Sequence, residues 1–293
     1  MVHSFQDNFF IEKSKKLGRP LILDGAMGSL LQENNVPVDN HLWMSKAILE
    51  NPDIIKNIYA DYIKCGADII TTNTFRTNLS AVKHSSFKSE ILVKEALKIA
   101  KESVINTEVL IAGSNPPAED CYQVERALSN SEIENNHKKH IDLLFENECD
   151  FVLNETQSHL DEIRIICEHC KKNNFPFVIS LFITEELNIL SGEKLIDVIN
   201  FIKKYNPLAV SFNCIMISTF KKIFEEIDLD FNWGVYLNCG DGTFKNENIK
   251  CGVPPDEYSE TIEKYLDKKP LFVGACCGSS PEHIKKIKKL LDG

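Results

Sequence analysis

The stretch FVLNETQSHLDEIRIICEHCKKNNFPFVISLF, residues 151–182, contains the repeating unit of this chain. Its first run, Phe151–Asn154, is short, apolar and rich in strand-forming residues, and residues 159–173 follow with the apolar spacing of an amphipathic helix. A second apolar run, Phe177–Phe182, comes next. The order strand, helix, strand predicts two parallel strands joined by a crossover helix.

The same unit recurs along the chain, and no Pro/Gly/Ser-rich linker interrupts it. The predicted strands are Leu21–Asp24, Ala67–Thr72, Val109–Gly113, Phe151–Asn154, Phe177–Phe182, Ala209–Asn213, Trp233–Asn238 and Leu271–Ala275. The predicted helices lie near residues 53–65, 89–106, 131–148, 159–173, 193–205, 216–227, 255–267 and 281–291. Eight strands, each followed by a helix, favour a (β/α)8 TIM barrel, an α/β fold of about 250 residues.

We therefore expect a single barrel domain over residues 1–293, in which residues 1–17 form an N-terminal extension, either a helix or a loop. The alternative α/β architecture is a doubly wound open sheet. Its usual fingerprint is missing, because no G-x-G-x-x-G follows the first strand and the sequence contains no P-loop. The counting thus favours the barrel over the open sheet.

Composition limits the functional classes. The 33 Lys and Arg against 43 Asp and Glu give a formal net charge of −10, which argues against partners such as nucleic acid or an anionic membrane. The longest apolar runs are a few residues, far short of the roughly 20 that a membrane-spanning helix needs. Residues 1–16 have neither the apolar segment nor the small-residue cleavage site of a signal peptide, so we expect a cytoplasmic protein.

The cysteines point to a metal site. In a barrel the active site lies at the carboxyl ends of the strands, and four of the ten cysteines fall at such ends: Cys214, Cys239, Cys276 and Cys277. Converging thiolates favour zinc, and three of them leave the open fourth position of a catalytic site. We predict Cys214, Cys276 and Cys277 as the ligands, with Gly278 allowing the backbone to bend. The alternative for an adjacent Cys-Cys pair is two small buried side chains.

The remaining thiols are expected to be ordinary. Cys239 is interpreted mainly as a small side chain, with a fourth thiol near the metal or an oxidation-sensitive neighbour as alternatives. Cys167 and Cys170 have metal-ligand spacing but lie in a helical pattern with no second pair, so we expect core or surface thiols. His283 is expected in the first turn of the last helix, in a structural or supporting role.

Four motifs resemble the homocysteine S-methyltransferase family over nearly the whole chain, roughly residues 21–291. They are Asp24-Gly25-Ala26-Met27-Gly28, the segment from Gly66 to Phe75, Asn213-Cys214, and the segment from Gly274 to Ile284. The resemblance implies a (β/α)8 barrel with a zinc ion on Cys214, Cys276 and Cys277 that binds the homocysteine thiol.

The resemblance also implies the substrate residues. Asp24 and Gly25 would line the homocysteine pocket, and Glu155 would hold the substrate amino group. From the residues alone, Asp24-Gly25 is equally ordinary turn chemistry and Glu155 is equally a rim carboxylate paired with a cation. Asn73 and Thr74 either bond the substrate or satisfy loop backbone groups.

The predicted function is zinc-dependent methyl transfer from a small donor to homocysteine, which gives methionine. An S-methylmethionine-type sulfonium is favoured as donor, with betaine or a corrinoid as alternatives, and another small thiol or selenol remains open as acceptor. A non-catalytic zinc-binding barrel is the alternative from a different class.

The expected partners of the enzyme are small-molecule substrates, and a monomer is slightly favoured. The segment Ser114–Ala118 departs from the family pattern, which leaves donor recognition open there.

Overall fold

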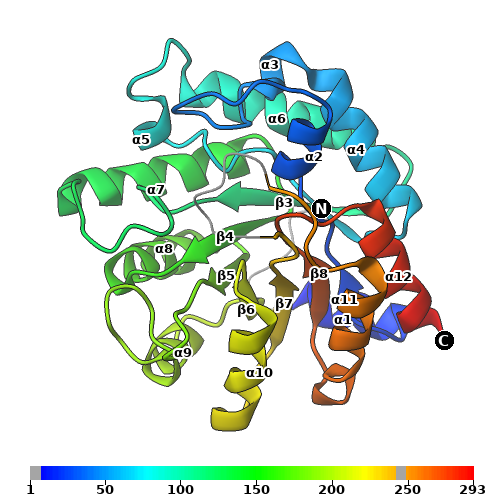
Figure 1. Ribbon diagram of the computed structural model, residues 1–293. Helices are drawn as coiled ribbons and strands as arrows, with labels where there is room; N and C mark the ends of the chain where they lie inside the picture. The colour runs from blue at the N-terminus through cyan, green and yellow to red at the C-terminus, as the bar shows by residue number, and fades with distance from the viewer. Residues whose placement is uncertain (1–7, 242–248) are drawn as a thin grey trace.

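The computed structural model describes residues 8–241 and 249–293, and within them eight parallel strands form a barrel surrounded by helices (Figure 1). The strands are β1 (Leu21–Ile22), β2 (Ile69–Thr71), β3 (Leu110–Asn115), β4 (Phe151–Gln157), β5 (Phe177–Leu181), β6 (Ala209–Asn213), β7 (Trp233–Leu237) and β8 (Phe272–Ala275). Residues 1–7 of the expected N-terminal extension lie outside the described residues.

The strands follow the order β1-β8-β7-β6-β5-β4-β3-β2, with each neighbouring pair hydrogen-bonded in parallel. A parallel bridge between Leu23 and Ile69 connects the two ends of this order. The backbone N–H of Asp68 also donates to the carbonyl of Ile22 at 2.7 Å. These contacts close the sheet, which confirms the predicted barrel and excludes the open sheet.

Long helices pack around the outside of the barrel, and their buried faces are the apolar stripes expected from the sequence. They are α4 (Pro52–Lys64), α6 (Ser89–Ser103), α7 (Asn130–Glu146), α8 (Leu160–Asn173), α9 (Leu195–Lys203), α10 (Ile217–Glu226), α11 (Pro255–Glu263) and α12 (Pro281–Asp292). In α8, both Cys167 and Cys170 are fully buried in the hydrophobic core, so of the two expected positions, core or surface, they have the first. No described helix is long and apolar enough to cross a membrane.

Helix α1 (Phe9–Leu17) closes the amino-terminal end of the barrel. The ring of Phe10 packs edge-on against Phe151 and Phe272, the first residues of β4 and β8, at centroid distances of 4.9 and 6.0 Å. Asn8 caps the helix and also donates to the carbonyl of Leu208 at 2.8 Å. The extension is therefore a helix where it is described, and it covers the end of the barrel opposite the predicted site.

The structure adds short helices that the sequence pattern did not predict: α2 (Gly28–Glu33), α3 (Ala47–Glu50) and α5 (Leu79–Val82), with a 3-10 turn at Leu266–Lys268. It also lengthens β4, which was expected to end at Asn154 and runs to Gln157 through a register shift against β5. Thr156 has a φ of 56° in this shift, and its N–H donates to Asn213 Oδ1 at 2.9 Å. The irregular pairing changes which side chains face the barrel mouth.

Candidate active site

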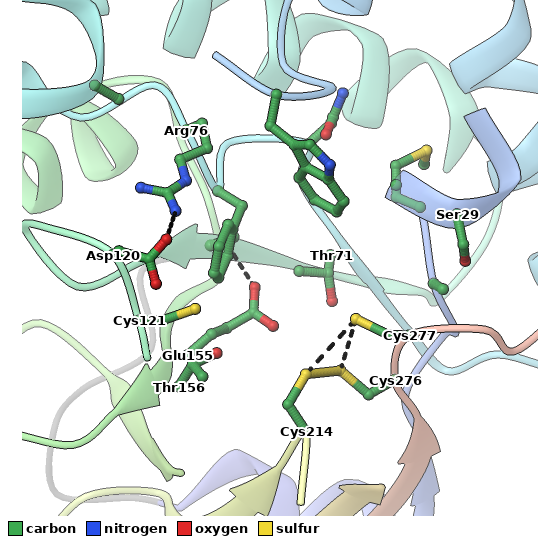
Figure 2. A pocket seen from close by; sticks show the side chains of 18 of the residues that line it. Ser29, Thr71, Arg76, Asp120, Cys121, Glu155, Thr156, Cys214, Cys276 and Cys277 are labelled. Carbon is green, nitrogen blue, oxygen red and sulfur yellow. Dashed lines mark hydrogen bonds and ion pairs between the residues drawn. A yellow bond between two sulfur atoms is a disulfide. The ribbon is translucent and has the colours of Figure 1, made fainter. Parts of the chain in front are cut away.

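A cavity of about 1010 Å³ opens at the carboxyl ends of the strands. Residues from the loops that follow β1, β2, β3, β6 and β8 line it, together with Glu155 and Thr156 of β4. Figure 2 shows the cysteine and carboxylate side chains that point into it. The volume is at the upper end of the usual range for small-molecule sites. The cavity lies at the end of the barrel where (β/α)8 enzymes have their active sites.

Three cysteine sulfurs meet at one side of this cavity. Cys214 follows β6, and Cys276 and Cys277 follow β8. Their sulfurs all lie within 4.8 Å of one another, with Cys277 Sγ 3.7 Å from Cys214 Sγ and 3.9 Å from Cys276 Sγ. In this structure Cys214 and Cys276 are joined as a disulfide (Figure 2). In the reduced state, three thiols that converge in this way are a donor set suited to a soft metal ion.

The local backbone explains how adjacent cysteines share this point. Cys214 adopts a left-handed conformation with φ 54°, which turns the chain at the end of β6. Gly278 has a φ of 78°, and a Cβ there would lie 2.6 Å from the Cα of Gly240. Because a side chain at 278 would be both strained and in collision, glycine is what allows the bend after Cys277.

Cys239 does not belong to this group. Its side chain is fully buried, and its sulfur contacts the carbonyl of Leu237 at 3.7 Å. Burial raises the pKa of its thiol well above the usual range. Among the described residues, the cluster able to hold a metal contains Cys214, Cys276 and Cys277 without Cys239, in accord with its interpretation as a small buried side chain.

Asp24 and Gly25 both line the cavity, directly after β1. Asp24 is 3% exposed, and its carboxylate accepts hydrogen bonds from the N–H of Thr71 at 2.8 Å and from its hydroxyl at 2.9 Å. Burial raises the pKa of Asp24 well above its usual value, and these two hydrogen bonds oppose that shift. The carboxyl group is thus held in one orientation at the cavity wall.

Glu155 lies in β4 and also lines the cavity. Ser114 Oγ donates to its Oε1 at 2.5 Å, and Tyr236 Oη donates to its Oε2 at 3.3 Å. Burial raises the pKa of Glu155 to about 7, although both hydrogen bonds favour the ionised form. A carboxylate of this kind gains by pairing with a cation that enters the cavity.

In the loop after β2, Asn73 lines the cavity and Thr74 does not. Asn73 lines the cavity, while its Nδ2 donates to the carbonyl of Met44 at 3.1 Å. Thr74 is fully buried and outside the cavity lining, and its hydroxyl donates to the carbonyl of Ser114 at 2.7 Å. The hydroxyl of Thr74 therefore bonds a backbone group, which is the second of the two roles that the sequence left open for it. The residue that sequence reasoning missed is Thr71, which fixes Asp24.

The lining of the cavity contains more acidic than basic side chains, and it also contains aromatic rings. The carboxylates among its lining residues are Asp24, Asp39, Glu119, Asp120 and Glu155, and the Lys and Arg residues are Arg76 and Lys83. The indole of Trp43 packs over Gly28, where a Cβ would collide with it. Trp43 and Phe75 form an edge-to-face pair with centroids 6.3 Å apart. Acidic groups with aromatic faces favour a positively charged ligand.

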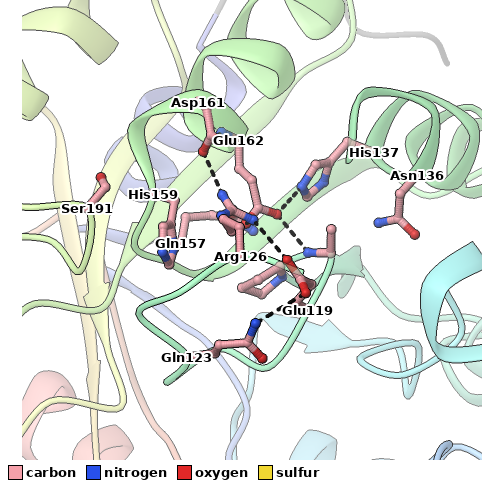
Figure 3. A network of polar contacts seen from close by, with 12 residues as sticks. Glu119, Gln123, Arg126, Asn136, His137, Gln157, His159, Asp161, Glu162 and Ser191 are labelled. Carbon is pink, nitrogen blue, oxygen red and sulfur yellow. Dashed lines mark hydrogen bonds and ion pairs between the residues drawn. The ribbon is translucent and has the colours of Figure 1, made fainter. Parts of the chain in front are cut away.

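The loop between β3 and α7 covers one side of the cavity and is anchored by a buried carboxylate (Figure 3). Glu162 of α8 is 1% exposed, accepts from the N–H of Ala118 at 2.7 Å, pairs with Arg126 at 2.5 Å and contacts His137 Nε2. Arg126 also donates to Asp161 at 2.6 Å. These contacts fix both ends of the loop against helix α8.

The closed α/β barrel and the three cysteine sulfurs at its mouth are the architecture of a barrel enzyme whose active site contains thiols. The sequence profile of the homocysteine S-methyltransferase family matches residues 21–291, and the chain belongs to this family. This finding confirms the resemblance drawn from the motifs and the prediction that the protein is a methyltransferase of this class.

Individual relatives support the assignment over nearly full length. The chain is 24% identical to homocysteine S-methyltransferase 2 of Zea mays, with 94% of this chain and 91% of the relative covered. It is 21% identical to a selenocysteine methyltransferase of Astragalus bisulcatus, with 94% and 93% covered. The metallated homocysteine methyltransferase MmuM of Escherichia coli has the same fold, with a TM-score of 0.76, 20% identity and coverage of 92% and 96%.

Proposed function

We propose that this protein transfers a methyl group to the thiol of homocysteine, which gives methionine, and that a zinc ion on Cys214, Cys276 and Cys277 takes part. The observation that carries the proposal is the convergence of three sulfurs within 4.8 Å of one another beside a cavity of about 1010 Å³. Such a cavity has room for two substrates of amino-acid size.

The donor set suits zinc. Thiolates are soft ligands, and three of them leave a tetrahedral site with one open position, as in catalytic zinc centres. When bound, zinc would lower the pKa of a coordinated substrate thiol so that it is a thiolate at neutral pH. Because ligation requires thiolates, the disulfide between Cys214 and Cys276 must be reduced before the metal binds.

The chain's own residues position the acceptor. Glu155, held by Ser114 and Tyr236, would pair with the ammonium group of homocysteine. Asp24, Gly25 and Asn73 would form the wall around its carbon chain, because all three line the cavity near the strand ends. Thr74 is left out of this set because its hydroxyl already bonds the carbonyl of Ser114.

The charge of the cavity favours an onium donor, and we propose an S-methylmethionine-type sulfonium. The acidic side chains of the lining and the rings of Trp43 and Phe75 attract a cation. In the transfer, the acceptor sulfur forms a bond to the methyl carbon while the donor carbon–sulfur bond breaks, and its electron pair stays on the donor sulfur. Positive charge is neutralised in this step, so a site with little water favours it.

The direct test is product formation. The reduced, zinc-loaded protein is mixed with homocysteine and, separately, with S-methylmethionine, betaine, S-adenosylmethionine or methylcobalamin, and methionine is measured by mass spectrometry. We expect methionine from S-methylmethionine. Methionine from betaine or methylcobalamin alone would correct the donor, and none from any donor would refute the proposal. Selenohomocysteine and selenocysteine as acceptors test the selenol alternative.

The alternative from another class is a non-catalytic zinc site closed by four thiolates. Cys239 is the fourth strand-end thiol, and its sulfur lies outside the cluster. Zinc stoichiometry of Cys239→Ser and Cys277→Ser separates the two functions. We expect Cys277→Ser to lose most of its zinc and Cys239→Ser to keep it, whereas equal losses would favour the closed site.

We further propose that the protein is a monomer that works in the cytoplasm with small molecules as its substrates. The monomeric state is checked by sedimentation equilibrium of the full chain. A stable dimer at micromolar concentration would contradict it.

A further inference from the structure

Among the described residues, Arg76 is one of two Lys and Arg side chains in a cavity lining that contains five carboxylates. It follows Phe75 in the loop after β2 and lines the cavity together with Asp39, Glu119 and Asp120. Its side chain is 23% exposed, so the charge is partly withdrawn from water. A partly buried guanidinium requires an anionic or hydrogen-bonding partner.

The partners that Arg76 has in the described residues hold it loosely. Its Nη2 lies 3.5 Å from Asp120 Oδ2, and its Nη1 lies 3.5 Å from the carbonyl of Glu119. Charge-assisted hydrogen bonds are usually about 2.7–2.9 Å long. Moreover, Asp120 is 57% exposed and so keeps access to water as a substitute partner.

Other arginines of this chain show what a tight partner looks like. Arg19 contacts Asp68 at 2.6 and 3.1 Å through two nitrogens, and Arg126 contacts Glu162 at 2.5 Å and Asp161 at 2.6 Å. These arginines bind parts of the fold together. Arg76 instead has long contacts and faces the cavity, as Figure 2 shows. Its guanidinium has five donors in a planar fork that matches a carboxylate.

The position of Arg76 suits the donor rather than the acceptor. Figure 2 shows Arg76 and Asp120 across Glu155 from the three cysteines, where the acceptor thiol is proposed to bind. Phe75 lies under the guanidinium, with Cζ 5.8 Å from the ring centroid, and the same ring pairs with Trp43. If the cationic centre of a ligand packs against these rings, another group of the same ligand lies near Arg76.

We infer that Arg76 is a specificity-determining residue that binds the carboxylate of the methyl donor, so that the donor is an amino-acid-like sulfonium with a free carboxylate. This inference rests on the proposed function. On binding, the carboxylate replaces the long contact to Asp120 with a bidentate pair, and the onium centre lies against the acidic and aromatic side chains of the lining. The cavity would then bind a donor that carries a carboxylate more tightly than a donor that lacks one.

The test compares two donors that differ only in that group: S-methylmethionine and its carboxamide. In the wild-type protein, kcat/KM is expected to be about 10- to 100-fold higher for the carboxylate, the usual value of one charge-assisted pair. Arg76→Gln should lose this preference by lowering kcat/KM for S-methylmethionine alone, with less than a threefold change for the amide. Arg76→Lys should keep part of the preference.

Lys83→Gln is the matched control. Lys83 also lines the cavity, but its side chain is 57% exposed, against 23% for Arg76. Its loss should leave the ratio between the two donors unchanged. Equal losses for both donors in Arg76→Gln, or an increase in the homocysteine KM, would overturn the inference, because the guanidinium would then serve the fold or the acceptor.

A binding measurement separates this inference from the proposed function. Calorimetric titration of S-methylmethionine into the reduced, zinc-loaded protein without homocysteine needs no reaction. Binding that weakens at least tenfold in Arg76→Gln supports the inference even if no methionine forms, in which case the proposed function alone fails. Equal binding to wild type and Arg76→Gln contradicts the inference whatever the activity.

Discussion

Gly278 determines the bend that brings Cys276 and Cys277 to one point. Its φ is 78°, and any Cβ at this position would lie 2.6 Å from Gly240 Cα, so every other residue is costly there. We predict that Gly278→Ala lowers the free energy of unfolding by about 2–4 kcal/mol, the sum of backbone strain and a close backbone contact, and weakens zinc binding. Urea unfolding and zinc titration measure the two effects.

Gly192→Ala is the control for backbone strain alone. Gly192 has a φ of 100°, yet a Cβ there would meet nothing within 4 Å. It should lose about 1 kcal/mol of stability and no zinc affinity. If the two variants behave alike, the close contact at Gly278 has no special role in the site.

Glu155 is the residue for which charge and place agree most clearly with substrate binding. We predict that Glu155→Gln raises the homocysteine KM by about 10- to 100-fold, because a charge-assisted pair with the substrate ammonium is lost, and changes kcat less. Steady-state kinetics with homocysteine as the varied substrate measure this. An unchanged KM would show that the ammonium binds elsewhere.

Several site residues could be predicted from the sequence because a strand end has a fixed place in a barrel. Cys214, Cys276 and Cys277 follow their strands directly, so their convergence needed only the strand count. Thr74 could not be resolved in the same way, since its direction depends on a hydrogen bond to Ser114, 40 residues away. The position of Asp24 was predicted, but its partner Thr71 lies in another strand.

Among the helices and strands, α7, α8 and the loop after β3 meet at a buried junction that contains charged side chains. Burial would raise the pKa of Glu162, but His137 and Arg126 outweigh it and lower the pKa to about 2. A depressed carboxyl pKa stabilises the fold above the unfolded value near 4.5 and loses that effect as the pH falls toward 2. At neutral pH, the lowered pKa of Glu162 contributes about 3 kcal/mol to the free energy of unfolding.

We therefore predict that Glu162→Gln lowers the free energy of unfolding at pH 7 and flattens its decline between about pH 5 and pH 2. Urea unfolding at a series of pH values checks this. Glu134→Gln is the control, because Glu134 pairs with Lys138 on the exposed face of α7 and should leave the curve unchanged. A Glu162→Gln curve parallel to that of the wild type would contradict the assignment.

The eight strands and the long helices were predictable to within a few residues because apolar period and length mark each one. The short helices α2, α3 and α5 were not, since four to six residues carry no readable helical period. Glu162 could not be singled out either. It lies in the first turn of α8, where acidic residues are ordinary, and only the fold brings Arg126 and His137 to it.

At the scale of the whole molecule, one end of the barrel contributes to stability and the other end carries the cavity. Helix α1 covers one end through Phe10, which is fully buried, and the cavity lies at the other. We predict that Phe10→Ala costs about 3–5 kcal/mol of stability and leaves kcat/KM of the folded protein within about twofold. Thermal unfolding and kinetics below the transition measure both.

Leu17→Ala is the matched control in the same helix, because Leu17 is 38% exposed. Its effect on stability should stay within about 0.5 kcal/mol. A loss of kcat/KM in folded Phe10→Ala would show that the two ends of the barrel are coupled.

In the proposed site, Cys214, Cys276 and Cys277 hold a zinc ion and leave one position for the substrate thiol. Zinc-edge X-ray absorption of the reduced, zinc-loaded protein tests it most directly, before and after homocysteine is added. We expect three sulfur neighbours of the zinc at about 2.3 Å without homocysteine and four with it. Four sulfur neighbours before homocysteine is added, or an unchanged number afterwards, would contradict a three-cysteine site with an open position.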